Sequence, residues 1–93
     1  MSETMFYILF ALREERHGYG IMQHVHQLTD GRVDLGAGTV YSTLRRLERQ
    51  KLIKATTEVD RRKNYVITGS GLKALTDEAR RIAELHQLGR ELL

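Results

Sequence analysis

Cysteine, proline and tryptophan are all absent from this chain of 93 residues. The lack of cysteine excludes disulfide bonds and thiolate-bound metals, which fits a reducing cytosol. The longest apolar run, Met5 to Leu12, is too short to cross a bilayer and lacks the basic flank of a signal peptide. No low-complexity tract or repeat divides the chain. We therefore expect a single cytoplasmic domain that makes no contact with a membrane.

Clusters of residues that could carry chemistry are also lacking. His24 and His26 lie two positions apart in a predicted helix and face different ways, which argues against a metal site. Gly69–Ala74 resembles part of a dinucleotide-binding fingerprint, but no further strand follows it to complete a βαβ unit. No nucleophile motif is present, and so short a chain has no second layer to form a cleft. The sequence therefore predicts no enzyme, no metal site and no cofactor.

Positive charge, in contrast, is concentrated in one segment. Residues 45–63 hold eight of the 15 basic residues but only three of the 12 acidic ones, and the rest of the chain is nearly neutral. A local cationic surface is typical of proteins that bind nucleic acid. On charge alone, a solvated basic face is an equally good interpretation.

Hydrophobic periodicity and turn residues predict helices over 3–15 and 19–28, a third helix that opens at 36–39, strands over 52–58 and 63–67, and a last helix over 70–92. Ser2 and Thr68 suit helix N-caps, and Gly31 suits a left-handed residue after the second helix. The two strands form a hairpin that needs one face packed on the helices. We expect Tyr65 in the core and Gly71 at a point of close packing.

The third helix is predicted to have two different faces. Val40, Leu44 and Leu47 recur on one side and should point to the core. The other side carries polar and basic residues, namely Tyr41, Ser42, Arg45, Arg46 and Arg49. A helix that is buried on one side and basic on the other can be held rigidly while its outer face enters a major groove.

The first and last helices are more apolar than one small core requires. Phe6 and Phe10 widen the apolar face of the first helix. The last helix carries an apolar seam made of Leu75, Ala79, Ile82, Leu85, Leu88 and Leu92. Because little of the chain remains to cover this seam, we expect these residues to join two copies of the chain. The alternative is that the last helix folds back on the first.

The predicted order of elements is that of a winged helix-turn-helix, a mainly α fold with a small β-hairpin. Residues 1–68 would form the DNA-binding part, and residues 69–93 a C-terminal dimerisation helix, within one continuous compact domain. Several short motifs make the prediction more specific, namely His17–Tyr19, Leu35–Tyr41, Leu52–Ile53, Arg62–Tyr65 and Thr68–Gly71. In these motifs the chain resembles the PadR family of bacterial transcriptional regulators.

The resemblance implies a dimeric repressor of the shorter branch of that family. Its third helix and wing would bind a palindromic operator in double-stranded DNA, and its last helix would swap across the dimer. It also implies that a small aromatic or cationic effector releases the DNA. Because the chain has no tryptophan, an effector pocket built on stacked indole rings is not supported. Lys51 stands where the family usually has glycine, so the left-handed turn expected there is costlier.

The residue types and the resemblance together indicate DNA contacts. Tyr41, with Thr39 and Ser42, is expected to meet a phosphate or a base edge near the start of the third helix. Arg45 is the candidate for reading guanine, with a phosphate clamp as the alternative. The candidates for contacts to the DNA backbone are Arg46, Arg49, Arg61, Arg62, Lys63, His17 and Tyr19. For Arg46 and Arg49 the alternative is an ion pair with a neighbour such as Glu48, and for His17 it is to fix the turn into the second helix.

We therefore predict a DNA-binding transcriptional regulator that acts as a homodimeric repressor. The alternative is a winged-helix protein-interaction module whose basic face meets an acidic partner. A third interpretation is a small-molecule carrier that uses the aromatic face of the first helix.

Overall fold

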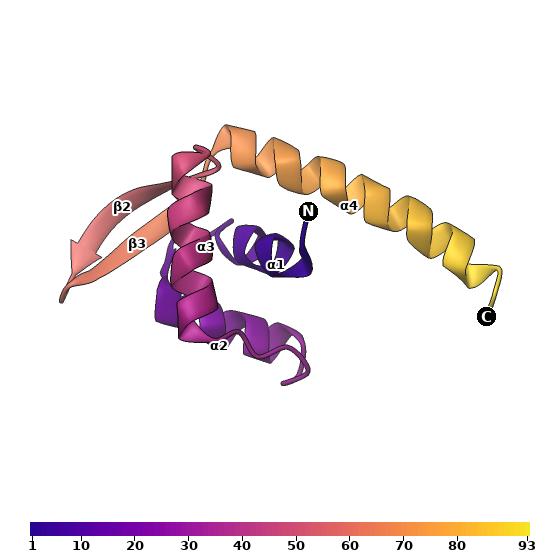
Figure 1. Ribbon diagram of the computed structural model, residues 1–93, viewed down its shortest axis with the longest axis horizontal. Coiled ribbons are helices and arrows are strands. Elements are labelled where there is room, and N and C mark those ends of the chain that lie inside the picture. Colours follow the sequence, from indigo (N-terminus) through magenta and orange to yellow (C-terminus); the bar gives the residue numbers. More distant parts are fainter.

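Four helices and three short strands make up the fold, and the computed structural model describes all 93 residues (Figure 1). In chain order they are α1 (Glu3–Ala11), β1 (Arg16–His17), α2 (Gly18–Leu28), α3 (Ala37–Arg49), β2 (Ile53–Val59), β3 (Arg62–Ile67) and α4 (Gly69–Arg90). The wing formed by β2 and β3 and the far end of α4 project from opposite ends of the helical body. This architecture confirms the winged helix-turn-helix predicted from the sequence.

One core joins the three short helices, the sheet and the start of α4. Its twelve buried apolar residues are Ile8, Leu9, Ala11, Leu12, Ile21, Val25, Val40, Leu44, Leu47, Ile53, Tyr65 and Leu75. The inward positions predicted on the third helix and the core position of Tyr65 are thus confirmed. Burial raises the pKa of the Tyr65 hydroxyl, and the nearby Glu48 carboxylate raises it further.

Side-chain caps fix where three of the helices begin. The Ser2 hydroxyl accepts a hydrogen bond from the Met5 amide (3.1 Å), and the Thr68 hydroxyl accepts one from the Gly71 amide (3.1 Å). His17 caps α2, since its Nδ1 accepts from the Gly20 amide at 3.0 Å. His17 therefore fixes the turn into the second helix, as the alternative interpretation of this residue predicted.

The first helix ends earlier than predicted, because the chain after it joins the sheet. Helix α1 stops at Ala11 rather than near residue 15, and Arg16 and His17 pair with the central strand β3. The Arg16 guanidinium donates to the Ala11 carbonyl oxygen (2.6 Å) and so satisfies the exposed end of the helix. The predicted two-stranded hairpin is therefore part of a three-stranded antiparallel sheet in the order β1-β3-β2.

A tight corner brings the ends of α3 and β3 together at the start of α4. Lys51 adopts the predicted left-handed conformation, with φ of 62°. Its carbonyl oxygen accepts a hydrogen bond from the Thr68 hydroxyl (2.8 Å), and the Leu52 carbonyl accepts one from the Thr68 amide (3.0 Å). A Cβ atom at Gly71 would overlap the Leu52 carbonyl oxygen, which confirms Gly71 as a point of close packing.

Helix α4 is buried at its start and exposed beyond its middle. Leu75 belongs to the core of its own chain, so the expectation that it faces a second copy needs correction. Glu78 is the last buried residue of the helix. Beyond it, Ile82, Leu85, Leu88 and Leu92 are exposed, and the helix itself ends at Arg90. None of the helices combines the length and the apolarity needed to cross a membrane.

Candidate nucleic-acid interface

Helix α3 is anchored on one side and open on the other. Val40, Leu44 and Leu47 are at most 1% exposed, so apolar packing fixes the helix on the body. The outer side carries the predicted residues, all of them exposed, namely Thr39, Tyr41, Ser42, Arg45, Arg46 and Arg49. The Ser42 hydroxyl donates to the Thr39 carbonyl oxygen (3.1 Å), which occupies its proton within the helix. The outer face is thus held in one orientation by contacts on the opposite side of the helix.

Tyr41 lies against the start of α2. A Cβ atom at the buried Gly18 would come within 2.7 Å of the Tyr41 ring, so only glycine leaves room for this packing. The ring nevertheless remains 45% exposed. One edge of the Tyr41 ring therefore packs on Gly18, and the rest of the ring faces solvent. The contact also explains why a glycine follows His17 in the sequence.

A stack of three side chains connects α2 to the wing. The rings of His17 and Tyr19 lie nearly parallel, with centroids 6.4 Å apart and an interplanar angle of 16°. The Arg62 guanidinium carbon lies 5.7 Å from the centre of the Tyr19 ring, within cation–π range. His17 and Tyr19 are therefore brought together with one of the predicted wing residues.

The wing is a bulged hairpin with a very short turn. Ala55 pairs with Tyr65 and Glu58 with Lys63, so β2 carries one extra residue between these pairs. At the bulge, the Thr57 hydroxyl donates to the Glu15 carboxylate (3.0 Å) and accepts from the Asn64 amide (3.1 Å). Sequence reasoning missed these three residues, because each is an ordinary polar residue until pairing sets the register.

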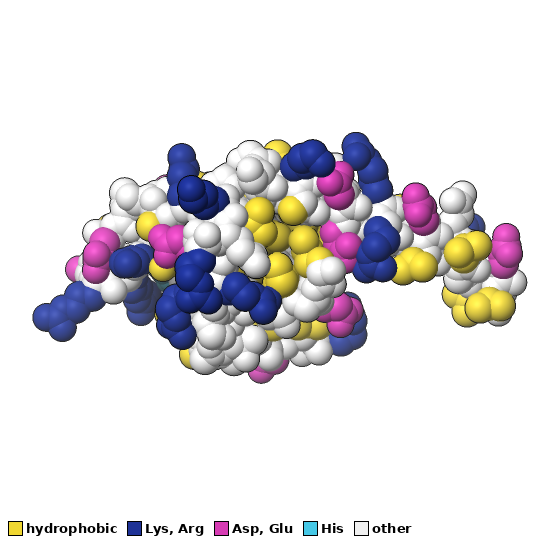
Figure 2. Space-filling model, turned by 45° about the horizontal axis from the view of Figure 1, so that its top comes forward, with side chains coloured by type: hydrophobic (Ala, Val, Ile, Leu, Met, Phe, Trp, Pro, Cys, Tyr) yellow, Lys and Arg dark blue, Asp and Glu magenta, His cyan; other side chains and the backbone are white.

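The basic residues of the 45–63 segment have no ion-pair partners. Every ion pair in the structure lies outside this segment, for example Lys73 with Asp77 and Arg81 with Glu78 on α4. The alternative in which Arg46 and Arg49 pair with neighbours is therefore wrong. Figure 2 shows the resulting surface, where Lys and Arg side chains gather over α3 and the wing. Uncompensated cations on one face attract a polyanion.

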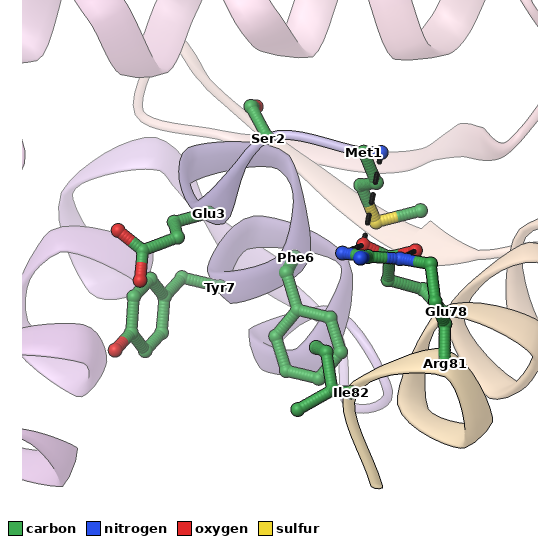
Figure 3. A pocket seen from close by; sticks show the side chains of 8 residues that line it. All are labelled: Met1, Ser2, Glu3, Phe6, Tyr7, Glu78, Arg81 and Ile82. Carbon is green, nitrogen blue, oxygen red and sulfur yellow. Dashed lines mark hydrogen bonds and ion pairs between the residues drawn. The ribbon is translucent and has the colours of Figure 1, made fainter. Parts of the chain in front are cut away.

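Two of the residues predicted to join copies of the chain lie together on α1. The rings of Phe6 and Phe10 are half-buried and stacked, with centroids 6.4 Å apart. The Arg13 guanidinium carbon lies 3.8 Å from the centre of the Phe10 ring. Phe6 and Ile82 of α4 both line a hollow of about 360 Å³ (Figure 3). This aromatic face is therefore covered only in part by its own chain.

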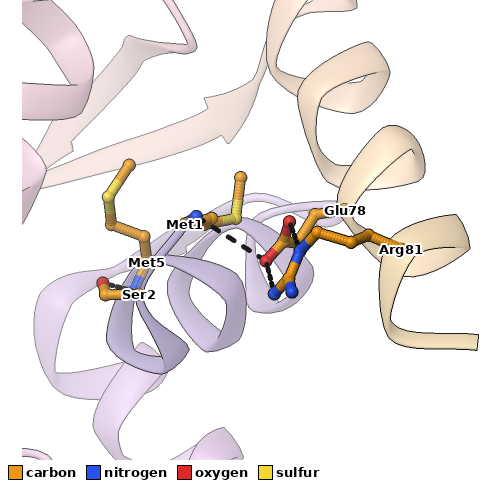
Figure 4. Close-up of polar contacts among 5 residues, drawn as sticks. All are labelled: Met1, Ser2, Met5, Glu78 and Arg81. Atoms are coloured by element: carbon orange, nitrogen blue, oxygen red, sulfur yellow. Dashed lines mark hydrogen bonds and ion pairs between the residues drawn. The ribbon is translucent and has the colours of Figure 1, made fainter. Parts of the chain in front are cut away.

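A carboxylate closes one wall of that hollow. Glu78 accepts two hydrogen bonds from the Arg81 guanidinium, at 2.8 and 2.7 Å, and its carboxylate lies 3.7 Å from the Met1 amine (Figure 4). The hydrogen bonds from Arg81 lower the pKa of Glu78, and the positive charges of Arg81 and the amine lower it further. Sequence reasoning missed Glu78; the available signal was an acid three residues before Arg81 on the apolar seam.

The sequence of this chain matches the profile of one known protein family. The profile of the Transcriptional regulator PadR-like family matches residues 8–77, a span that runs from α1 through the wing into α4. The chain belongs to the PadR-like family. This confirms the resemblance seen in the sequence motifs. Because the family consists of transcriptional regulators, it also supports the prediction that the chain is not an enzyme.

Individual relatives of this PadR-like chain differ widely in length. It is 32% identical over 85 residues to an uncharacterised 37.1 kDa protein in transposon Tn4556 of Streptomyces fradiae. That match covers 90% of this chain but only 24% of the transposon protein. The chain thus corresponds to about a quarter of that relative.

Solved structures share the fold over almost the whole chain. A PadR family transcriptional regulator from Eggerthella lenta is 30% identical, with a TM-score of 0.76 over 96% of this chain and 80% of that one. PadR of Bacillus subtilis in complex with operator DNA is 24% identical, with a TM-score of 0.76 over 84% of this chain and 47% of that one. At this level of identity the second comparison establishes a common fold.

Proposed function

We propose that this PadR-like protein is a sequence-specific DNA-binding transcriptional repressor that acts as a homodimer in the cytoplasm. The observation that carries the proposal is the rigidly seated α3, whose outer face bears three arginines without ion-pair partners. Arg45 lies one turn from Tyr41 on the same side and is the candidate for reading guanine. Arg46 and Arg49, with Thr39, would contact phosphates, whereas the Ser42 hydroxyl proton is engaged by the Thr39 carbonyl oxygen.

Binding would place α3 in the major groove and the wing against the neighbouring backbone. The crystal structure of Bacillus subtilis PadR, which has the same fold and is in complex with operator DNA, supports DNA as the partner of this surface. His17 and Tyr19 lie beside the wing residues Arg62 and Lys63, so one continuous surface would meet the duplex.

The exposed half of α4 supports a dimer. We assign residues 69–93 to dimerisation and residues 1–68 to DNA binding, with the first turns of α4 as the shared boundary. In a second copy, the exposed seam residues Ala79, Ile82, Leu85, Leu88 and Leu92 would find apolar cover, and the aromatic face of Phe6 and Phe10 is available to provide it. A two-fold axis would then set two half-sites roughly 34 Å apart, which requires a palindromic operator.

The hollow between α1 and α4 is the proposed site for a regulatory ligand. Its walls combine the aromatic rings of Phe6 and Tyr7 with the carboxylate of Glu3 and the ion pair of Glu78 with Arg81. Aromatic faces and carboxylates together suit a small aromatic or cationic effector. Because the hollow lies where the proposed dimerisation helix leaves the body, an occupant would change the distance between the two DNA-binding parts.

Selection from a random pool of duplexes, followed by mobility-shift titration, tests the proposal. We expect enrichment of a palindrome and binding of two chains per duplex at physiological salt. If no duplex is retained at micromolar protein, the basic face serves another acidic partner and the DNA-binding function is rejected. If a single asymmetric half-site is enriched and bound by one chain, the dimeric mode is rejected while DNA binding stands.

A further inference from the structure

Three adjacent cations near the tip of the wing have different surroundings. Arg62 lies over the Tyr19 ring at 5.7 Å, and that ring stacks on His17. Lys63 stands opposite Glu58 across the two strands. The side chain of Arg61 is exposed and makes no hydrogen bond, ion pair or cation–π contact. Residues that the sequence presents as equivalent therefore differ in what they can do.

The turn that carries Arg61 is strained. Val59 and Arg62 are the last paired residues, so Asp60 and Arg61 alone form the loop, with φ of 52° and 66°. A two-residue hairpin turn with both central residues at positive φ strongly favours Asn, Asp or Gly. Asp60 fits this preference. Arg61 does not, because its Cβ atom is crowded in the left-handed conformation.

Comparison with the other left-handed residues separates Arg61 from them. Besides Asp60 and Arg61, only Asp30 and Lys51 among the non-glycine residues have positive φ. Asp30 is a residue type that tolerates this conformation. Lys51 lies just after Gln50, the C-cap of α3, where a cation interacts favourably with the helix dipole, and the Lys51 carbonyl oxygen accepts a hydrogen bond from Thr68. Arg61 alone is a disfavoured residue type whose side chain makes no contact that explains its positive φ.

We propose that Arg61 is the wing residue that contacts a DNA phosphate from its strained turn, whereas Arg62 positions the wing through Tyr19. The inference rests on the proposed DNA-binding function and assigns separate roles within that site. A strained position without a structural purpose is typical of functional residues. A guanidinium at the apex of a two-residue turn is free to pair with phosphate oxygens. The Arg62 guanidinium instead lies over the aromatic face of Tyr19.

The first test is Arg61→Gly, which relieves the strain and removes the charge. We expect the Tm to rise by about 4 °C, since one strained residue in a small domain has an effect of this order. Affinity for operator and unrelated duplexes should fall alike, by about tenfold, with a flatter dependence on salt. Asp60→Asn is the matched control, because it keeps a favoured turn residue and removes a negative charge, so its affinity should rise. Wild-type affinity for Arg61→Gly, or a lower Tm, overturns the assignment.

The second test is a double-mutant cycle on Tyr19 and Arg62. Tyr19→Leu and Arg62→Ala should each reduce affinity several-fold while the salt dependence stays that of the wild type, because no phosphate contact is lost. The double variant should bind no more weakly than either single variant, and Arg62→Lys should retain affinity through the same ring. Additive losses, or a flattened salt dependence in Arg62→Ala, would reject the positioning role.

Wild-type protein measured in the same titrations keeps the two proposals distinguishable. If the wild type binds no duplex, the proposed function fails regardless of the variants. If the wild type binds and the Arg61 and Arg62 variants do not differ from one another in affinity and salt dependence, DNA binding stands and only this division of roles is wrong.

Discussion

Helices α3 and α4 both carry an apolar stripe along one side, but the chain covers the two stripes to different extents. On α3 the stripe is completely buried within the same chain. On α4 burial ends at Glu78, and the large apolar residues of the seam beyond it, Ile82, Leu85, Leu88 and Leu92, are 41% to 88% exposed. A covered stripe leaves the opposite face free to recognise a ligand. An uncovered stripe is itself a recognition surface, for which we propose a second copy as the occupant.

Charging the uncovered stripe should have the largest effect. Leu85→Glu combined with Leu88→Glu would place two carboxylates per chain in the proposed interface, where their desolvation is costly. We expect monomers in sedimentation velocity. Affinity for a palindromic duplex should fall by about a hundredfold or more, because binding of the second half-site is no longer intramolecular.

Gln87→Glu is the matched control for that double variant. Gln87 lies between the two leucines in sequence but about 200° around the helix from Leu85, and it is exposed. It should remain a dimer with wild-type affinity. Dimers that persist in the double variant at micromolar concentration would contradict the proposal that α4 joins the copies.

The buried start of α4 is tested by two glycines in its first turn. Gly71→Ala places a methyl group against the Leu52 carbonyl oxygen, so we expect a loss of about 3 kcal/mol in the free energy of unfolding. Gly69→Ala has no atom within 4 Å of the new methyl group and should leave stability unchanged or slightly higher. Denaturant unfolding of the two variants measures the difference. Equal stabilities would mean that α4 is not docked as described.

The sequence was sufficient to predict both stripes, because helical periodicity depends only on local spacing. Val40, Leu44 and Leu47 repeat at helical intervals, and the caps Ser2 and Thr68 are local signals of the same kind. The close contact at Gly71 was predicted from its place after a strand at a helix start. For the candidate site, periodicity likewise placed the exposed face of α3.

What escaped prediction depends on contacts between distant residues. Strand β1 has only two residues, Arg16 and His17, so it is too short to show an alternating pattern of apolar and polar residues. It becomes a strand only because it pairs with β3. The burial of Glu78 depends on how α4 lies across α1. The different roles inferred for Arg61 and Arg62 depend on backbone φ and on the position of Tyr19, neither of which a count of charges contains.

The exposed face of α3 is tested by replacing two of its arginines one at a time. Arg45→Ala should weaken binding to the selected operator by about tenfold and leave unrelated DNA almost unaffected, because a base contact carries sequence information. Arg49→Ala should weaken both by the same smaller factor, as loss of a phosphate contact would. Competition titrations with the two duplexes measure the ratio of the affinity for the operator to the affinity for unrelated DNA. If Arg45→Ala lowers both affinities equally, α3 contacts only the backbone at this position.

The smallest expected effect lies where burial on α4 ends. The pKa of Glu78 is lowered from its ordinary value of 4.5, first by hydrogen bonds from Arg81, so folding favours the ionised carboxylate. Its contribution to stability should be complete above pH 4.5 and lost as the pH falls through the lowered pKa. Glu78→Gln should therefore unfold more easily than the wild type at neutral pH, and the two should converge under acidic conditions. Urea unfolding between neutral and acidic pH measures this difference, and Asp77→Gln, on the exposed side of the same turn, should lose less stability at neutral pH. If the difference in stability between Glu78→Gln and the wild type stays constant across this pH range, the ion pair of Glu78 does not hold α4 at the point where the helix leaves the body.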